Sequence, residues 1–191
     1  MNDFFTLVSD NPVIASITDL NQLDVALNSS CQIIFLLTGN IFNLKTVSNK
    51  IFNKNKELYV YVDAIDGFSK DSWGLEYIIK NIPLNGIITS KPSLVQQSKN
   101  MGIFTIQRMC IYDTLSLEKL FYSIKECRPN GLEILPGVIP TIIKHIVKNT
   151  RIPLIAGGLI FEREDIITCL EAGSIAISTS NSNIWYDDFK Y

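Results

Sequence analysis

The sequence predicts a compact, single-domain (β/α)8 barrel, or TIM barrel, over residues 1–191. Short apolar segments and amphipathic helical segments alternate along the whole chain, with one strand–helix unit roughly every 18 to 29 residues. The apolar segments are hydrophobic on both faces, as expected of parallel strands covered by helices. A doubly wound open sheet is the competing architecture. It would have a glycine-rich turn after the first strand, and residues 15–18 (Ala-Ser-Ile-Thr) contain no glycine.

The strands are expected where short runs of apolar and β-branched residues end in polar residues, glycine or proline. The predicted strands are residues 12–16, 32–37, 58–62, 86–89, 103–107, 131–135, 152–156 and 174–177. Three of them end at residues that can carry chemistry or fix a turn: Asp63, Arg108 and the pair Pro136-Gly137. In a (β/α)8 barrel such positions lie at the carboxyl ends of the strands, where binding sites form.

Between the strands, apolar residues recur three or four positions apart, which is the helical period. The first helix carries Leu20, Leu23 and Leu27 and is capped by Thr18 or Asp19, and the second begins at Asn43 and carries Leu44, Val47 and Ile51. The third carries Trp73, Tyr77 and Ile78, and the fourth begins at Pro92, carries Leu94, Val95 and Met101, and is stopped by Gly102. The fifth carries Leu117, Leu120, Phe121 and Ile124, the sixth covers residues 141–148, and the seventh carries Ile166, Ile167 and Leu170. Only six residues follow Trp185, so the eighth helix must be short or incomplete.

Composition narrows the class of protein. The chain has 17 Lys and Arg against 19 Asp and Glu, a net charge of −2, which gives no global sign of a nucleic-acid-binding protein. Four widely spaced cysteines, no signal peptide and no apolar run of about 18 residues predict a cytoplasmic protein with reduced thiols and no membrane segment. Because His145 is the only histidine, a histidine-based metal cluster is excluded, and no metal is expected.

The last quarter of the chain predicts a phosphate site. The seventh strand ends in Gly157 and Gly158, and the eighth ends in Ser178, Thr179 and Ser180. In (β/α)8 barrels the loops after these two strands commonly bind phosphate, because glycine exposes backbone amides and hydroxyls donate hydrogen bonds. The alternative for the glycine pair is an ordinary tight turn.

Four charged residues are expected to line the same rim: Asp63, Lys91, Arg108 and Glu133. Glu133 lies between two apolar residues, so strand alternation turns its side chain into the barrel, where a carboxylate needs a partner such as Arg108 or Lys91. Each has a simpler alternative. Glu133 could form a structural ion pair, Asp63 could brace a loop, and the two cations could be solvated rim charges.

These residues lie in segments that resemble a known family. The resemblance covers nearly the whole chain, and its distinctive parts are 62–63, 86–91, 106–108 with 113–114, 133–140, 155–160 and 178–185. The chain is similar to the glycerol-3-phosphate-responsive antiterminators, bacterial regulators of glycerol utilisation with a (β/α)8 barrel. The resemblance implies a ligand, glycerol 3-phosphate, and a target, a leader mRNA with a terminator. It implies no cofactor, and it assigns the phosphate to 157–158 and 178–180.

Two functions follow from this. The first is a non-enzymatic sensor that binds glycerol 3-phosphate and then RNA. A homodimer of this sensor would present two RNA-binding faces. The second is an isomerase or aldolase for a small phosphorylated substrate, with Asp63 or Glu133 as acid or base and Lys91 as amine nucleophile. Basic residues gather at 45–56 and 144–151, but such runs are usually solvated helix faces, so RNA binding is an expectation of the resemblance and not of charge.

Overall fold

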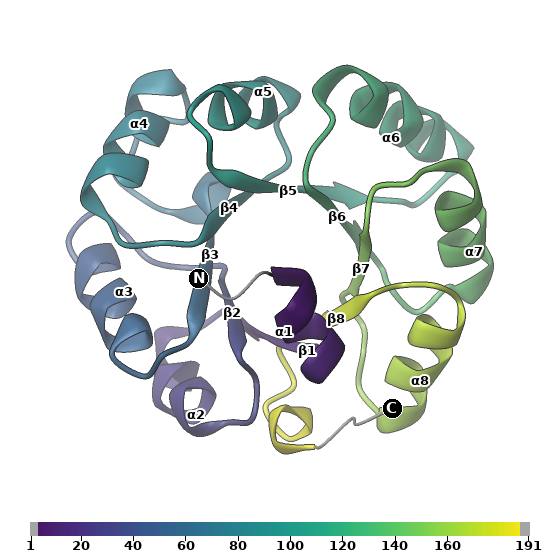
Figure 1. The fold of residues 1–191 in the computed structure, drawn as a ribbon, viewed down its shortest axis with the longest axis horizontal. Coiled ribbons are helices and arrows are strands. Elements are labelled where there is room, and N and C mark those ends of the chain that lie inside the picture. The colour runs from purple at the N-terminus through teal and green to yellow at the C-terminus, as the bar shows by residue number, and fades with distance from the viewer. Residues whose placement is uncertain (1–3, 188–191) are drawn as a thin grey trace.

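The structure is a computed structural model that describes residues 4–187 of the chain. Eight parallel strands pair in sequence order, and β8 pairs with β1 to close the barrel (Figure 1). The strands are β1 (Val13–Ile17), β2 (Ile33–Leu36), β3 (Glu57–Tyr61), β4 (Gly86–Thr89), β5 (Phe104–Cys110), β6 (Gly131–Leu135), β7 (Leu154–Gly157) and β8 (Ala176–Thr179). The predicted (β/α)8 barrel is therefore confirmed.

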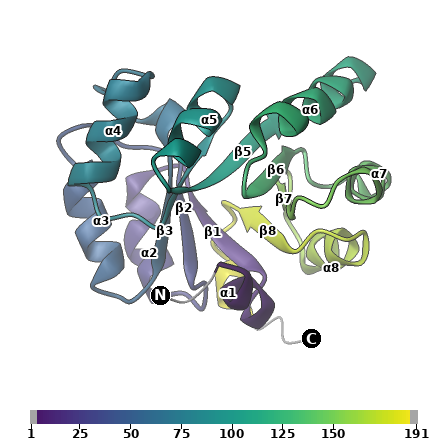
Figure 2. The same ribbon diagram turned by 45° about the horizontal axis from the view of Figure 1, so that its top comes forward.

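Helices form an outer ring around the strands (Figures 1 and 2). They are η1 (Leu20–Gln22) with α2 (Leu23–Asn28), α3 (Leu44–Phe52), α4 (Ser72–Asn81), α5 (Pro92–Asn100), α6 (Thr114–Cys127), α7 (Pro140–Asn149) and α8 (Arg163–Glu171). After β8 the residues described up to 187 place one 3₁₀ turn, η3 (Ile184–Tyr186), in this ring position, as expected of a short or incomplete last helix. Fully buried Trp185 fills this position, and its indole Nε1 donates to the Thr179 carbonyl at 2.9 Å.

One α-helix was not predicted. α1 (Phe4–Asp10) precedes the first strand and lies across the end of the barrel at which the strands begin, at the centre of the ring in Figure 1. Phe4 is buried there, with its ring 5.3 Å from that of Tyr59 and 5.2 Å from that of Phe104. Aromatic rings in these arrangements attract one another beyond the area that they bury. The helix thus closes the barrel opposite the candidate site.

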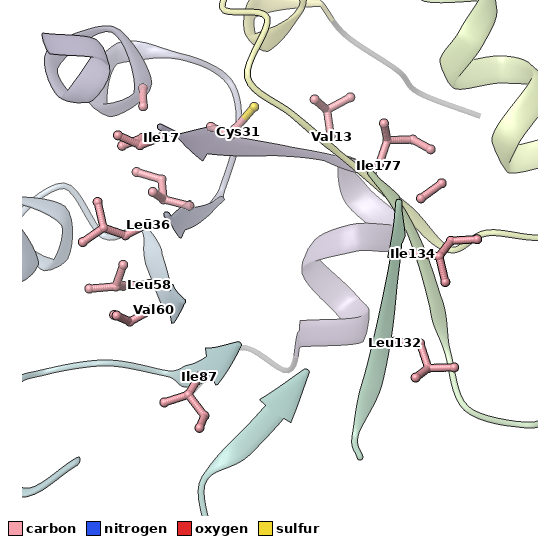
Figure 3. Close-up of a cluster of buried hydrophobic side chains, with 14 of the residues drawn as sticks. Val13, Ile17, Cys31, Leu36, Leu58, Val60, Ile87, Leu132, Ile134 and Ile177 are labelled. Carbon is pink, nitrogen blue, oxygen red and sulfur yellow. The ribbon is translucent and has the colours of Figure 1, made fainter. Parts of the chain in front are cut away.

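Strand alternation divides the core into two apolar layers. Residues such as Val13, Leu58 and Ile134 point outward against the helices, and Figure 3 shows this layer. The other set of side chains fills the barrel interior together with α1: Ile14, Ile33, Phe35, Tyr59, Ile88, Ile106, Ile155 and Ala176. Burying one large aliphatic side chain stabilises the fold by roughly 1.5–3 kcal/mol, so both layers contribute substantially to the stability of the barrel. The polar residues described next lie above the inner layer.

Several strand ends differ from the prediction, and two of these differences affect charged residues of the site. β5 continues to Cys110, so Arg108 lies within the strand and pairs with Glu133 in register. β3 ends at Tyr61, and Asp63 belongs to a 3₁₀ turn, η2 (Val62–Ala64). In both cases hydrogen bonding to the neighbouring strand, which composition does not reveal, sets the end of the strand.

The described residues contain no helix that is long and apolar enough to cross a membrane. All four cysteines are free, and Cys31, Cys127 and Cys169 are buried. Burial raises the pKa of Cys31 and that of Cys169 to about 11 each. Because the thiolate is the reactive form of cysteine, these two thiols are structural side chains.

Candidate functional site at the carboxyl ends of the strands

A cluster of polar side chains from three strands lies inside the mouth of the barrel. Glu133 on β6 is buried, and its Oε1 accepts a hydrogen bond of 2.5 Å from the Ser178 hydroxyl on β8. On the other side, Arg108 Nε on β5 lies 3.4 Å from Glu133 Oε2. The Arg108 guanidinium also lies over the ring of Tyr61, 5.0 Å from its centroid. Alternation predicted the inward direction of Glu133, and of its two expected partners the structure selects Arg108.

Glu133 is not fully satisfied by its partners. Burial raises the pKa of its carboxyl, and the nearby charge of Arg108 and the hydrogen bond from Ser178 only oppose that rise. Its Oε2 forms no hydrogen bond to the described residues. Oε2 has the Arg108 ion pair at 3.4 Å but no hydrogen bond, so a ligand that brings a hydroxyl or amino donor would be stabilised here.

Gly157 makes room for this cluster. A Cβ at this position would lie 2.4 Å from Ser178 Oγ and 2.9 Å from Glu133 Oε1, so any side chain would push them apart. Gly158 has φ of 75°, and a Cβ there would approach Leu135 Cδ2 to 3.0 Å. Leu159 follows in the same left-handed region with φ of 60°, which is unusual for a leucine. The loop after β7 is therefore built on an unusual backbone.

The hydroxyl residues at the end of β8 point in different directions. Ser178 faces the interior, whereas the Thr179 hydroxyl donates to the Ile160 carbonyl at 3.1 Å and accepts from the backbone of Asn181. Ser180 is exposed, and its carbonyl accepts from the side chain of Gln22. Thr179 thus ties the loops after β7 and β8 together. Its assignment to phosphate binding stays a prediction, as do those of Ser178 and Ser180.

Asp63 and Lys91 lie farther out on the rim. Asp63 accepts hydrogen bonds from the Thr89 hydroxyl at 2.9 Å and from the backbone and hydroxyl of Ser90 at 2.7 and 2.6 Å. Both carboxylate oxygens are engaged, and the residue ties the ends of β3 and β4 together. Lys91 is the exposed N-cap of α5, and its Nζ donates to the Lys70 carbonyl at 3.3 Å. The hydrogen-bond partners of both residues are thus groups other than Arg108, Glu133 and Ser178.

Ser16 and Tyr61 were not among the residues predicted for the site. Ser16 on β1 is buried, and its hydroxyl forms no hydrogen bond to the described residues. It alternates with interior Ile14, so the signal was present in the period of the strand. The side chain of Gln107, by contrast, points outward, and its Nε2 donates to the Ser123 hydroxyl on α6 at 2.6 Å. This direction is expected because Gln107 is adjacent to Arg108, which points into the mouth.

The chemistry of the cluster is that of recognition by charge and hydrogen bonds. Glu133 Oε2 and the Ser16 hydroxyl form no hydrogen bond to the described residues, and Arg108, whose side chain is 18% exposed, offers a cation beside Glu133. Together they suit a small ligand that carries both hydroxyl groups and a negative charge. Within residues 4–187, no group of three His, Cys, Asp or Glu side chains is placed to bind a metal ion.

Comparison with known proteins gives a consistent answer. The family model described as "Glycerol-3-phosphate responsive antiterminator" matches residues 13–185. Among curated proteins, the uncharacterized protein YgcP of Escherichia coli (strain K12) is 34% identical over 179 residues, which are 94% of each chain.

Two solved structures have the same barrel. The glycerol uptake operon antiterminator regulatory protein of Listeria monocytogenes aligns with a TM-score of 0.89 at 24% identity, over 92% of this chain and 95% of the other. A glycerol uptake operon antiterminator-related protein of Thermotoga maritima aligns with a TM-score of 0.81 at 27% identity, over 91% and 96%. The Listeria likeness supports the fold alone, and the family rests on the match over 13–185.

Proposed function

Because the chain belongs to the glycerol-3-phosphate responsive antiterminator family, we propose that it is a cytoplasmic, non-enzymatic sensor of glycerol 3-phosphate that acts on RNA. In the proposed mechanism the liganded protein binds the leader mRNA of glycerol-utilisation genes and lets polymerase read through a terminator. Its effector is its one small-molecule partner, and no cofactor is required.

The observation that carries this proposal is buried Glu133, whose Oε2 forms an ion pair with Arg108 but accepts no hydrogen bond from the described residues. Glycerol 3-phosphate presents two hydroxyls and a phosphate on a three-carbon chain. The hydroxyls would donate to Glu133 Oε2 and exchange hydrogen bonds with Ser16, and the phosphate would be bound by Arg108 and the loops at 157–158 and 178–180. Hydrogen bonds from a hydroxyl to a carboxylate and from a guanidinium to a phosphate are charge-assisted, and such bonds are stronger than neutral ones.

Thermal unfolding with glycerol 3-phosphate, glycerol and inorganic phosphate tests the ligand. A ligand that binds only the folded state stabilises it by about 2.7 kcal/mol at a hundredfold excess over Kd. Glycerol 3-phosphate should raise Tm where equal concentrations of the other two do not. Arg108→Met should lose this response, and Lys125→Met, which removes a distant exposed cation, should keep it. Equal responses in the two variants would remove Arg108 from the site.

Catalysis on a phosphorylated substrate is the second candidate, and the raised pKa of Glu133 favours it, since a poised carboxyl can transfer protons. The contacts of the other predicted catalytic residues do not support it. Lys91 lies outside the interior with its Nζ on a backbone carbonyl, and Asp63 is held by Thr89 and Ser90. Borohydride reduction in the presence of dihydroxyacetone phosphate decides the matter, because a covalent adduct on Lys91 would establish an amine nucleophile and overturn the sensor.

A homodimer is part of the proposal. Large apolar side chains are exposed at the carboxyl-end rim: Phe42, Trp73, Tyr112 and Phe161 are 91%, 77%, 78% and 64% exposed. Exposed aromatic residues of this size are typical of surfaces that pair with another protein. Sedimentation equilibrium at micromolar concentration should give twice the monomer mass, and a strict monomer that binds RNA tightly would contradict the dimer.

A further inference from the structure

Positive charge is distributed unevenly in this acidic chain. Residues 91–153, which run from the start of α5 to the start of β7, contain nine Lys and Arg against four Asp and Glu, whereas the whole chain has 17 against 19. One basic and one acidic residue of this segment, Arg108 and Glu133, neutralise each other inside the barrel. The excess therefore lies on the outer surface of this part of the barrel.

Much of it surrounds a groove of about 670 Å3 between the carboxyl-terminal ends of α6 and α7. Its polar lining is Lys125, Arg128, His145, Asn149, Thr150 and Arg151, with Phe121 and Ile152 among the apolar residues. No acidic side chain lines it. Figure 1 shows α6 and α7 side by side on the far side of the barrel from α3. The salt bridges found among residues 4–187 involve none of these cations.

Some of this positive charge has a structural role, because basic residues at the carboxyl-terminal end of a helix offset the negative end of its dipole. The ends of α6 and α7 each carry a partial charge of roughly −0.5 from their free carbonyls, which Lys125 and Lys148 in the last turns offset. Arg128 and Arg151 lie beyond these helices, so about three of the four positive charges remain uncompensated by the two helix ends. Glu126 on the outer face of α6 lowers that excess by one.

Arg128 supplies an independent observation. It is the C-cap of α6 with φ of 49° and ψ of 62°, the left-handed conformation in which glycine is favoured over any side chain. Its backbone carbonyl accepts a hydrogen bond from Lys99 Nζ at 2.6 Å, but its exposed guanidinium forms no salt bridge to the described residues. A local structure that favours glycine here carries an arginine instead, which points to a role for its side chain outside the fold.

We infer that the groove between α6 and α7 binds the phosphate backbone of an RNA strand, an inference that rests on the proposed function. The cations are exposed and spread over both walls instead of converging on a buried point. This arrangement suits a repeating polyanion better than a small anion. The groove also lies at the end of the barrel opposite the mouth, so RNA and glycerol 3-phosphate would bind at the same time.

The test is binding of a labelled, single-stranded RNA of mixed sequence, roughly 20 nucleotides long, followed by fluorescence anisotropy at several salt concentrations with saturating glycerol 3-phosphate. The test variant is Arg128→Gly with Arg151→Ala, and the matched control is Lys45→Ala with Lys50→Ala on α3, which also removes two exposed cations. Arg128→Gly suits the left-handed cap, so Tm of the test variant should stay the same or rise. The effector-induced Tm shift should not change.

The test variant should lower the slope of log K against log salt by about 1.4, since each phosphate contact to a single strand contributes about 0.7. Between 1 M and 0.1 M salt this corresponds to about a 25-fold loss of affinity, and the control variant should lose far less. If both variants bind as wild type does, or lose affinity equally, the groove is not the RNA surface although the proposed function stands. If wild type itself binds no RNA with or without the effector, RNA binding fails, and the groove with it.

Discussion

At the scale of single residues, the barrel mouth depends on Gly157 having no side chain. In Gly157→Ala the new Cβ would lie within 2.4 Å of Ser178 Oγ and 2.9 Å of Glu133 Oε1, so their hydrogen bond must break or the backbone must move. Overpacking and a weakened bond to a buried carboxylate together should lower the free energy of unfolding by about 2–4 kcal/mol. Urea unfolding measures this difference.

Gly131→Ala is the matched control, because it also adds a methyl group inside a strand of the barrel. Its Cβ would meet Ile106 at 3.5 Å and the Pro153 carbonyl at 3.8 Å, which are ordinary contacts. The control should change stability by less than about 1 kcal/mol in either direction. Equal losses in the two variants would show that strand glycines matter in general and that the mouth has no special requirement.

A second residue-scale prediction concerns the pH dependence that Glu133 creates. Because burial raises the pKa of its carboxyl above the ordinary value of 4.5, the folded protein holds that proton more tightly than the unfolded chain does. The folded state therefore loses stability as pH rises from 4.5 through the raised pKa, by at most about 1.4 kcal/mol per pH unit. Glu133→Gln does not titrate, so its stability relative to wild type should increase over this range. Urea midpoints of both proteins between pH 4 and 8 measure the difference, and a flat difference would contradict the prediction.

Residue-level reasoning from sequence succeeded where a simple period determines direction. Alternation between apolar neighbours put Glu133 inside the barrel, and the structure confirms this. It could not show that Thr179 turns away to hold the Ile160 carbonyl, or that Asp63 is occupied by Thr89 and Ser90, because those contacts depend on the paths of loops from other strands. Polar residues near a strand end can be found from sequence, but their partners cannot.

At the scale of elements, α1 is the part of the fold that the sequence did not reveal. Its seven residues are too few to show a helical period, and it is held by the aromatic residues of β3 and β5 more than by its own propensity. The strand and helix order, by contrast, was predictable because every unit repeats the same two periods. The strand ends differed by up to three residues, as for β5, whose end is set by pairing with β6.

The contribution of α1 can be measured with Phe4→Ala. Phe4 is 3% exposed and packs on Tyr59 and Phe104, so removal of the ring leaves a cavity at the closed end of the barrel. The expected loss in the free energy of unfolding is about 3–5 kcal/mol. Tyr122→Ala also removes an aromatic ring, from a side chain that is 72% exposed, and it should stay within about 0.5 kcal/mol of wild type. A small effect of Phe4→Ala would mean that α1 is only loosely attached.

At the scale of the whole molecule, the proposed effector site and the proposed RNA groove lie towards opposite ends of β5. β5 carries Arg108 near its carboxyl end, and Thr105, its second residue, forms two hydrogen bonds with Asn130, two residues after the groove residue Arg128. At a rise of about 3.3 Å per residue, the distance along the strand from Thr105 to Arg108 is only about 10 Å. A change at the mouth therefore needs to travel a short way through a packed sheet to reach the groove.

If the two sites are coupled, the coupling must be reciprocal. Glycerol 3-phosphate should raise the affinity for RNA by a factor in the usual range of roughly 5 to 150, and RNA should raise the affinity for glycerol 3-phosphate by the same factor. Anisotropy with and without the effector gives the first factor, and calorimetric titration of the effector with and without RNA gives the second. In Arg108→Met the effector should no longer change RNA affinity, whereas basal RNA binding should persist because the groove is intact. Equal RNA affinity with and without saturating effector in wild type would contradict a sensor, since a ligand that binds both states equally shifts neither.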